Sequence, residues 1–496
     1  MEGKKNYNII LVNLDGMRRD KVDFCPSLDK LKKQSYFFPL MDTVSPYTFA
    51  SLHAIFSGMY PSKNGVNGYY NIFRFKKNEI KTITQMLSEV GYFTSCDIID
   101  DSVIPNQGFD DFNIFDDKKD ELIAAGIRIF GPGATVSQDL EPEYIAVSED
   151  SEFAWVTLQE NNAVAVIGLD ALQMNTLFPL GYKDHSIAGN ELDASNEQDF
   201  IFMANWPIYG MYQPDGIATY NIGGVNYFVT ANEGDAREYD TLEEETDLAD
   251  LDLDETAFPD ADFLLLDENL GKISFTSQTG DTDGDGDMDE LYVFGGRSFS
   301  IYNQNTGQMV YDSGDDFERI IAEDSAWYPI FNATDDENEF KNRSDNKGPE
   351  PESVIVKEIE GKWYAFIGLE RVGGFMAYDV SNPASPVFEG YYNNRSTNPG
   401  EDITGDLAPE GMIYVKPEDN GLEKGLVVIA NEVSATISVY TLDNVTLCFY
   451  YRFYQVKVLK MRFCYAHRRF TLYPQSVDSW NLSFDNYTDD FLSKVK

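Results

Sequence analysis

The sequence predicts a multi-domain protein with an α/β segment over residues 1–122, an all-β propeller over 123–444 and a short basic, aromatic tail over 445–496. Three observations predict it. A short Pro-acidic phrase occurs four times in the middle part, each time opening a β-like run. The hydrophobic period changes near Ile123. The net charge steps from -2 to -48 and then to +4 along these parts, which is typical of units of different origin.

The acidic middle part limits what the chain can bind. Phosphate contacts need Lys and Arg, so a net charge of -48 argues against nucleic acid as a partner. The charge favours metal ions, above all calcium, whose ligands are oxygen atoms. A solubilising acidic surface is the alternative, because net charge alone says nothing about fold.

The remaining bulk features exclude several classes. The four cysteines avoid the acidic middle part, so they form neither a disulfide framework nor a zinc motif. No uncharged apolar run reaches 18 residues, and we expect no transmembrane segment. The start, Met1 to Lys21, lacks a basic and then apolar leader, so we expect no signal peptide in this chain.

The α/β segment begins with a metal-site pattern. Asn8–Leu14 is an apolar run of strand length that delivers Asp15 at its carboxyl end, a usual position for a metal ligand. Thr48 lies where a loop turns into a helix, and the backbone N–H groups there favour an anion. Thr82 to Val90 predicts a further helix.

These motifs resemble the amino-terminal part of the sulfatase and alkaline-phosphatase superfamily. The resemblance is carried by Asp15 with Arg18 and Asp20, the block from Thr48 to Pro61, Gly91-Tyr92 with Thr94, and Gly108-Phe109-Asp110. It implies a partial α/β sulfatase-like sandwich in which Thr48 is the nucleophile. It also implies that Asp15 binds the metal that activates Thr48 for attack on a phosphate or sulfate ester.

The sequence departs from this superfamily in ways that predict an incomplete site. Asn13 stands where many sulfatases have an Asp, and Asn64 where Pro-x-x-His-Gly is common. The later Asp and His ligands should follow residue 122, yet the whole chain has three histidines. Because catalysis needs the whole constellation, an α/β fragment without activity is the alternative for this part.

The middle part reads as blades of antiparallel sheet. Its first blade is predicted from three successive strands, Tyr144–Val147, Phe153–Leu158 and Ala163–Ile167. Comparable strand sets follow Pro214, Pro351 and Pro409, and another lies near Leu291 to Asp312.

This part resembles the secreted β-propeller family called the choice-of-anchor I domain. The resemblance is closest at residues 126–134, 139–147, 181–185, 230–237, 312–319 and 368–374. Family members carry further blades before the point that matches Ile123, so the propeller is predicted to be truncated at its start. The resemblance implies an extracellular or cell-surface location.

The repeated phrase predicts a metal centre. Its acidic residues are Glu143, Asp215, Glu352 and Glu410. Second acidic residues follow 17, 18, 18 and 22 positions later, at Glu160, Glu233, Glu370 and Glu432. Innermost propeller strands line the central channel, so the first set should form a ring at one mouth, and we expect the second set to return there. Calcium would balance these charges. The alternative is that each Glu accepts backbone N–H bonds at a blade turn.

A second calcium motif lies in the loop 280–290. Asp281, Asp283 and Asp285 stand at positions 1, 3 and 5 of a calcium loop, with Gly286 at the sharp turn. Asp287 and Asp289 add two candidate ligands. Position 12 is Tyr292, so the bidentate Glu of an EF-hand is missing, and a plain Asp/Gly turn is the alternative.

Together these features favour a calcium-binding propeller of extracellular type, with metal-dependent phosphate- or sulfate-ester hydrolysis as an uncertain addition. Alkaline phosphatases that use calcium and iron are also built on propellers with Glu-lined centres, and this likeness implies a second divalent or ferric ion. A non-enzymatic surface or adhesion propeller is one alternative, and a fusion of two incomplete domains without activity is another. For the tail we expect a hairpin docked on an acidic neighbour; a partner-binding or membrane-surface strand is the alternative.

Overall fold

The structure of the chain is a computed structural model. It describes residues 44–45, 48–68, 71–98, 104–169, 173–239, 242–398, 403–422, 424–442 and 450–451. The predicted strand Asn8–Leu14, the predicted metal ligand Asp15 and nearly all of the tail lie outside the described residues. The chain divides into two compact units, Met1–Val456 and Lys457–Lys496. The second unit lies wholly outside the described residues.

The amino-terminal part contains short helices and one parallel strand pair. Its elements are α2 (Thr48–Ser57), α3 (Pro61–Asn64), η2 (Ile72–Arg74), α4 (Ile83–Glu89), β1 (Ser95–Ile98), β2 (Asp111–Ile114), η3 (Phe115–Lys118) and α5 (Lys119–Ala124), with β1 and β2 parallel. Thr82 starts α4 as predicted, because its side chain and that of Gln85 form a capping box. The motif residues Thr94 and Asp110 meet, since the Thr94 N–H donates to Asp110 Oδ2 at 2.8 Å.

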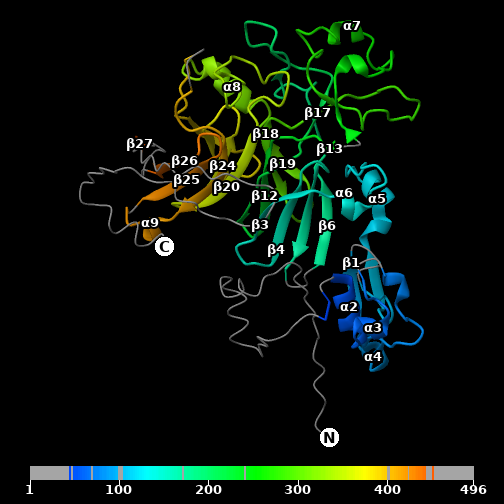
Figure 1. Cartoon of the computed structure of the whole chain (residues 1–496). Helices are drawn as coiled ribbons and strands as arrows, with labels where there is room; N and C mark the ends of the chain where they lie inside the picture. The colour runs from blue at the N-terminus through cyan, green and yellow to red at the C-terminus, as the bar shows by residue number, and fades with distance from the viewer. Residues whose placement is uncertain are drawn as a thin grey trace, which may run out of the picture. The chain divides into compact units, whose positions relative to one another are not determined.

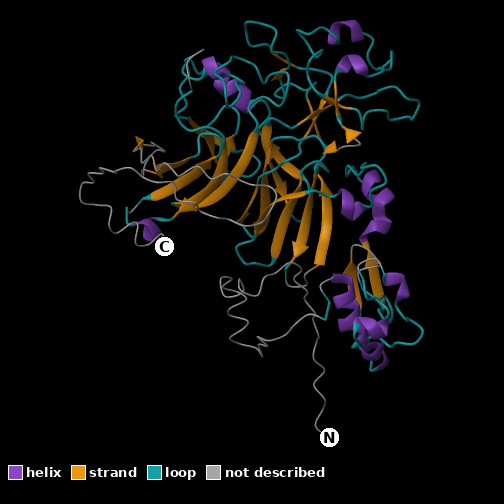
Figure 2. Cartoon of the chain, in the orientation of Figure 1, coloured by secondary structure: helices purple, strands orange, loops and turns teal. Residues whose placement is uncertain are grey.

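Strands dominate the rest of the described chain (Figure 2). Four antiparallel sheets of four strands each follow the chain. Sheet 1 contains β3 (Pro142–Val147), β4 (Phe153–Leu158), β5 (Ala163–Gly168) and β6 (Gln173–Pro179). Sheet 2 contains β11 (Ile217–Ile222), β12 (Val225–Asn232), β18 (Ser298–Asn303) and β19 (Met309–Asp312). Sheet 3 contains β20 (Pro351–Ile359), β21 (Lys362–Leu369), β22 (Phe375–Asp379) and β23 (Val387–Tyr392). Sheet 4 contains β24 (Pro409–Val415), β25 (Gly425–Asn431), β26 (Thr436–Leu442) and β27 (Tyr450–Tyr451).

The sheets pack face to face in chain order. Their first strands follow one another in the order β3, β11, β20 and β24 (Figure 1). Apolar side chains fill each interface, for example Trp155 against Phe228 between sheets 1 and 2, and Phe366 against Met412 between sheets 3 and 4. Burying one large apolar side chain contributes about 1.5–3 kcal/mol to the stability of the fold, so these interfaces hold neighbouring sheets together.

The far face of sheet 1 is covered by residues that precede it. Ile127, Ile129 and Val136 pack on this face, and Val136 begins the short helix α6 (Val136–Asp139). The predicted strands of the first blade are confirmed, and β6 follows as its fourth strand.

The prediction of a separate strand set near Leu291 to Asp312 is wrong. Strands β18 and β19 pair onto β12 and complete sheet 2, so residues 233–297 form an insertion between its second and third strands. Small strands fold within and beside this insertion: β7 (Tyr182–Asp184), β8 (Leu192–Asp193), β9 (Met203–Ala204), β10 (Tyr209–Met211), β13 (Glu238–Tyr239), β14 (Leu242–Glu243), β15 (Glu245–Thr246), β16 (Phe275–Thr276) and β17 (Tyr292–Phe294).

The remaining helices are short. They are η4 (Leu248–Asp250), α7 (Ala261–Leu264), α8 (Asp316–Glu323), η5 (Tyr328–Ile330) and α9 (Pro417–Asn420). Among the described residues, none of the helices combines the length and the apolar character that crossing a membrane requires.

Candidate metal centre

Each Pro-acidic phrase lies where the first strand of its sheet begins. In β3, β20 and β24 the pairing register shifts just after the proline, so that one extra residue is accommodated there. Glu143, Glu352 and Glu410 lie within these bulges, and Asp215 lies just before β11. A bulge re-aims the side chain that it carries, so the phrase places its carboxylate away from the regular pleat.

Hydrogen bonds tie neighbouring phrases together. The Thr157 hydroxyl donates to the Asp215 carbonyl oxygen at 2.8 Å, and the Gly216 N–H donates to the Glu352 carbonyl oxygen at 2.9 Å. The Ser353 hydroxyl donates to the Pro409 carbonyl oxygen at 3.1 Å. Successive phrases are therefore adjacent in space, although they are far apart in the sequence.

The second acidic set returns to the same end, as expected for antiparallel strands. Each residue follows the second strand of its sheet: Glu160 follows β4, Glu233 follows β12, Glu370 follows β21 and Glu432 follows β25. The Glu370 N–H donates to the carbonyl oxygen of Glu350 at 2.7 Å, and the Glu432 N–H to that of Ala408 at 2.8 Å. These bonds hold the second set beside the phrases.

The residue before the proline is strained in three of the four copies. Gln213, Glu350 and Ala408 have φ angles of 39°, 51° and 57°. A left-handed backbone at a residue other than glycine costs about 1–3 kcal/mol and persists only where the surroundings fix it. The bonds to the Glu350 and Ala408 carbonyls are part of what fixes it.

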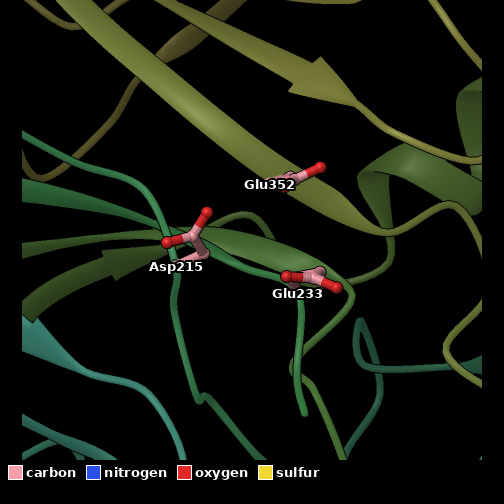
Figure 3. Close-up of side chains that lie close together, drawn as sticks. All are labelled: Asp215, Glu233 and Glu352. Atoms are coloured by element: carbon pink, nitrogen blue, oxygen red, sulfur yellow. The ribbon is translucent and has the colours of Figure 1, made fainter. Parts of the chain in front are cut away.

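A group of three carboxylates forms where these elements meet, and among the described residues only one of the three, Glu233, has a cationic partner. Asp215, Glu233 and Glu352 each offer an oxygen atom, and these atoms lie within 4.8 Å of one another (Figure 3). Glu352 is only 9% exposed, and its Oε2 atom is buried without a hydrogen-bond partner. Burial, with the charges of Glu233 and Glu410 among its neighbours, raises the pKa of Asp215 to about 7. Burial, followed by the charge of Glu370, raises the pKa of Glu352 to about 12.

A second group shares Glu233 but is compensated by cations. Oxygen atoms of Glu233, Glu350 and Glu370 also lie within 4.8 Å of one another. Lys347 Nζ lies 2.9 Å from Glu233 Oε1, and Arg371 Nη2 lies 3.3 Å from Glu370 Oε1.

Glu350 receives the most cations of this second group. Lys347 lies 3.3 Å away, Arg371 lies 3.1 Å away, and Arg343 Nε donates to it at 3.0 Å. Burial opposes ionisation of Glu350, but the charges of Lys347, Arg343 and Arg371 together lower its pKa. Burial instead dominates at Glu370, where it raises the pKa to about 8.

The other predicted ligands of the ring differ in burial. Glu160 is 6% exposed, its Oε2 atom has no partner, and burial raises its pKa to about 8. Burial and then the charge of Glu141 raise the pKa of Glu143. Glu410 is exposed, and its charge is among the causes that raise the pKa of Glu352. Glu432 is exposed.

The loop 280–290 gathers three of its five predicted ligands. Asp281, Asp283 and Asp285 offer oxygen atoms within 4.8 Å of one another, and all three are exposed. Asp281 also accepts the Gly284 N–H at 2.6 Å, while Asp289 accepts the Thr282 N–H at 2.8 Å. The group of three does not include Asp287 or Asp289.

Two family models match the chain. A family model described as the Choice-of-anchor I domain matches residues 94–383, which is more than half of the chain. The chain belongs to the choice-of-anchor I family. A model described as Type I phosphodiesterase / nucleotide pyrophosphatase matches residues 9–92, in agreement with the phosphatase resemblance of that part.

Two curated relatives are similar to this choice-of-anchor I chain. Gigasin-3a of Magallana gigas is 33% identical over 196 residues, which make up 35% of this chain and 66% of the relative. The Mesenchyme-specific cell surface glycoprotein of Strongylocentrotus purpuratus is 28% identical over 296 residues, which make up 52% of this chain and 37% of the relative. The chain thus spans less than two thirds of the length of either relative.

Similarity to solved structures is low. Kuenenia stuttgartiensis hydrazine synthase gives a TM-score of 0.19 at 11% identity, covering 63% of this chain and 80% of that chain. A dihydro-heme d1 dehydrogenase gives 0.18 at 10% identity, covering 63% and 57%. At these scores neither structure supports an argument about this choice-of-anchor I chain.

Only one residue of the catalytic pair predicted for the phosphodiesterase-like part, Thr48, lies among the described residues. Asp15 lies outside them, and Thr48 is the first residue of α2, at the predicted junction of loop and helix. Asn64, which stands where the superfamily commonly has a histidine, is buried. Its Oδ1 atom accepts the Val66 N–H at 2.9 Å and its Nδ2 atom donates to the Ser57 hydroxyl at 3.2 Å. These bonds give Asn64 a structural role in its own turn.

Sequence reasoning missed two acidic residues that act on this centre. Glu350 belongs to the second group, and the charge of Asp235 acts on Glu143, Glu160 and Asp215. Glu350 could have been found, because Pro349-Glu350 directly precedes Pro351-Glu352 and doubles the phrase. Asp235 follows Glu233 by two positions in an acidic loop and carries no such signal.

Proposed function

We propose that this choice-of-anchor I chain is a calcium-binding β-propeller of extracellular or cell-surface type. Its four sheets are the blades, and the repeated phrases hold a calcium ion where the first strands begin. The observation that carries the proposal is the group of Asp215, Glu233 and Glu352, whose oxygen atoms lie within 4.8 Å of one another.

The surroundings of this group support a bound cation. Carboxylates this close cannot all ionise unless a cation binds them. Among the described residues, no Lys or Arg forms an ion pair with Asp215 or Glu352. The buried Oε2 atom of Glu352 also lacks a hydrogen-bond partner. A buried polar atom without a partner is rare in native proteins.

The chemistry of the donors favours calcium over softer metals. All of the candidate ligands are oxygen atoms, and calcium takes six to eight oxygen ligands with flexible geometry. Asp215, Glu233 and Glu352 would hold the ion, and the charges of Glu410 and Glu143 also act on Asp215. A second divalent or ferric ion and a separate calcium ion in loop 280–290 are parts of the same proposal.

The extracellular location rests on relatives and charge. One relative is named a cell surface glycoprotein, and the family is a choice-of-anchor domain. A strongly acidic surface suits a soluble propeller domain that binds cations.

Calorimetric titration of the chelator-stripped protein with calcium chloride tests the proposal. The Glu352→Gln variant keeps the shape of the side chain but loses its charge, and we expect it to lose one bound ion per chain. Glu358→Gln is the matched control, because Glu358 is an exposed residue of the same strand. Equal stoichiometry in wild type and Glu352→Gln contradicts the proposal.

Ester hydrolysis is a second candidate function. The observation that favours it is the match of residues 9–92 to the phosphodiesterase model. The test is an assay with p-nitrophenyl phosphate and p-nitrophenyl sulfate, with and without calcium. Turnover above that of a mock purification supports hydrolysis, and its absence leaves the calcium-binding surface propeller as the function.

A further inference from the structure

Lys347 occupies the position of a cation inside the carboxylate centre. Its Nζ atom lies 2.9 Å from Glu233 Oε1 and 3.3 Å from Glu350 Oε2, and it donates to the Gly234 carbonyl oxygen at 2.6 Å. The side chain is only 15% exposed. A buried ammonium group needs such partners, because its desolvation is costly without them.

Lys347 belongs to a network of paired charges. Three carboxylates, Glu233, Glu350 and Glu370, face three cations, Lys347, Arg343 and Arg371. Arg371 also pairs with a fourth carboxylate, Asp335, at 3.1 Å. The neighbouring group differs, since Asp215 and Glu352 have no such cations among the described residues. The cations that act on Glu233 therefore belong to its group with Glu350 and Glu370.

Glu233 is the residue that the two groups share. One of its oxygens faces Lys347, and the other accepts a hydrogen bond from Gln159 Nε2 at 3.0 Å. A metal ion held by Asp215, Glu233 and Glu352 must therefore draw on a carboxylate that a lysine already neutralises. The ammonium group of Lys347 and a metal ion bound to the same carboxylate would repel each other, and this repulsion is strong where the dielectric constant is low.

We propose that Lys347 is a tethered counter-ion that competes with a divalent cation for Glu233 and thereby sets the affinity of the Asp215–Glu233–Glu352 centre. Lys347 is a positioning residue, since it acts through Glu233. This inference rests on the proposed function, because it concerns the same centre.

Two variants of Lys347 separate competition from a merely structural role. Lys347→Met removes the charge and keeps most of the side-chain volume, whereas Lys347→Arg keeps the charge. We expect Lys347→Met to bind calcium at least tenfold more tightly by calorimetry, and yet to melt at a lower temperature in chelator, where Glu233 has lost its partner. A structural role would weaken both binding and stability. Lys347→Arg should stay near the wild-type affinity.

Lys362→Met is the matched control. Lys362 is exposed and pairs with Asp379 at 2.7 Å, away from the carboxylate centre. We expect this variant to leave calcium affinity unchanged. Unchanged or weaker binding in Lys347→Met overturns the inference.

A measurement on the unaltered protein covers the case in which Lys347→Met does not fold. Calcium that draws Glu233 away should free the Lys347 amine, so its acetylation by acetic anhydride, followed by mass spectrometry, should speed up at least threefold when calcium replaces chelator. Lys362 should label at the same rate in both conditions. An unchanged labelling ratio of Lys347 to Lys362 overturns the inference.

The outcomes distinguish this inference from the proposed function. If Glu352→Gln loses the ion but neither Lys347→Met nor the labelling responds, Lys347 does not compete and only this inference falls. If Glu352→Gln binds calcium like wild type, the proposed centre falls, whatever Lys347 does.

Discussion

At the residue scale, Glu350 and Glu352 show how surroundings decide what a carboxylate does. The two stand two positions apart in one strand start, and both are buried. Three cations lower the pKa of Glu350, whereas burial beside other carboxylates raises that of Glu352. Glu350 is thus a partner for basic side chains, and Glu352 is left for a proton or a metal ion.

This difference predicts the pH dependence of the chelated protein. Burial raises the pKa of Asp215 to about 7 and those of Glu160 and Glu370 to about 8. In the window between the ordinary carboxyl pKa and these values, the folded state binds protons that the unfolded state has released. Stability must therefore fall as the pH rises through this window.

We expect the melting temperature in chelator to be lower at about pH 8 than at about pH 5. Calcium should reduce or reverse the difference, because it binds the ionised groups. Differential scanning calorimetry checks both statements. A melting temperature that rises with pH in chelator contradicts the assignment of raised pKa values.

Thr48 carries a prediction of its own. If ester hydrolysis is found, we expect Thr48→Ala to leave the rate unaltered, because the departures from the superfamily pattern predict an incomplete site. A matched variant, Ser51→Ala, controls for changes to the same helix. A loss of more than tenfold, or about 1.4 kcal/mol of barrier, would show that the amino-terminal site is complete.

At the scale of single elements, sequence periodicity predicts strands better than it predicts their partners. Phe153–Leu158 was found to the residue, because a run of β-branched and aromatic residues between two turns favours a strand. The pairing of β12 with β18 across residues 233–297 was missed. The entropy cost of closing a loop rises only slowly with its length, so a long insertion between two paired strands is tolerated. The local sequence pattern does not show which strand lies on the far side of such an insertion.

Gly216 tests the contact between neighbouring phrases. A Cβ atom at this position would lie 2.3 Å from the Glu352 carbonyl oxygen, so Gly216→Ala must push sheets 2 and 3 apart. We expect a destabilisation of about 1–3 kcal/mol, measured by denaturant unfolding, and weaker calcium binding. Gly411→Ala is the control, because the same position of the fourth phrase has open space around it. Equal effects of the two variants would contradict the close packing.

The loop 280–290 gives a prediction that is independent of the four sheets. Because Asp281, Asp283 and Asp285 lie together with calcium-loop spacing, Asp283→Ala should lose one calcium ion per chain in a calorimetric titration. Asp262→Ala, at another exposed acidic position, should lose none. Unchanged stoichiometry in Asp283→Ala leaves the plain Asp/Gly turn as the explanation.

At the scale of the whole molecule, the sequence predicts composition and repeats, and the structure adds which repeats meet. Charge steps and the fourfold phrase separate the acidic β part from its flanks. These sequence patterns could not show that Glu233 belongs to two groups, because Lys347 and Arg343 come from a long loop before sheet 3. Such contacts depend on three-dimensional closure rather than on spacing.

The chain as a whole should depend on calcium in a way that ordinary salt cannot replace. An ion that binds only the folded state stabilises it by mass action, so a chelator should lower the melting temperature. Without the ion, Asp215 and Glu352 stay buried beside other carboxylates, and they must either repel one another or take up protons. This cost is short-range and partly buried, so mobile salt relieves it poorly. Repulsion across an acidic surface, by contrast, would be screened by any salt.

Melting curves are therefore recorded in chelator, then with excess calcium, and then with sodium chloride at matched ionic strength. We expect full recovery with calcium and little with sodium chloride, and a smaller calcium effect in Glu352→Gln and Glu410→Gln. Equal recovery with both salts would refute the calcium centre and would leave a solubilising acidic surface as the role of these residues.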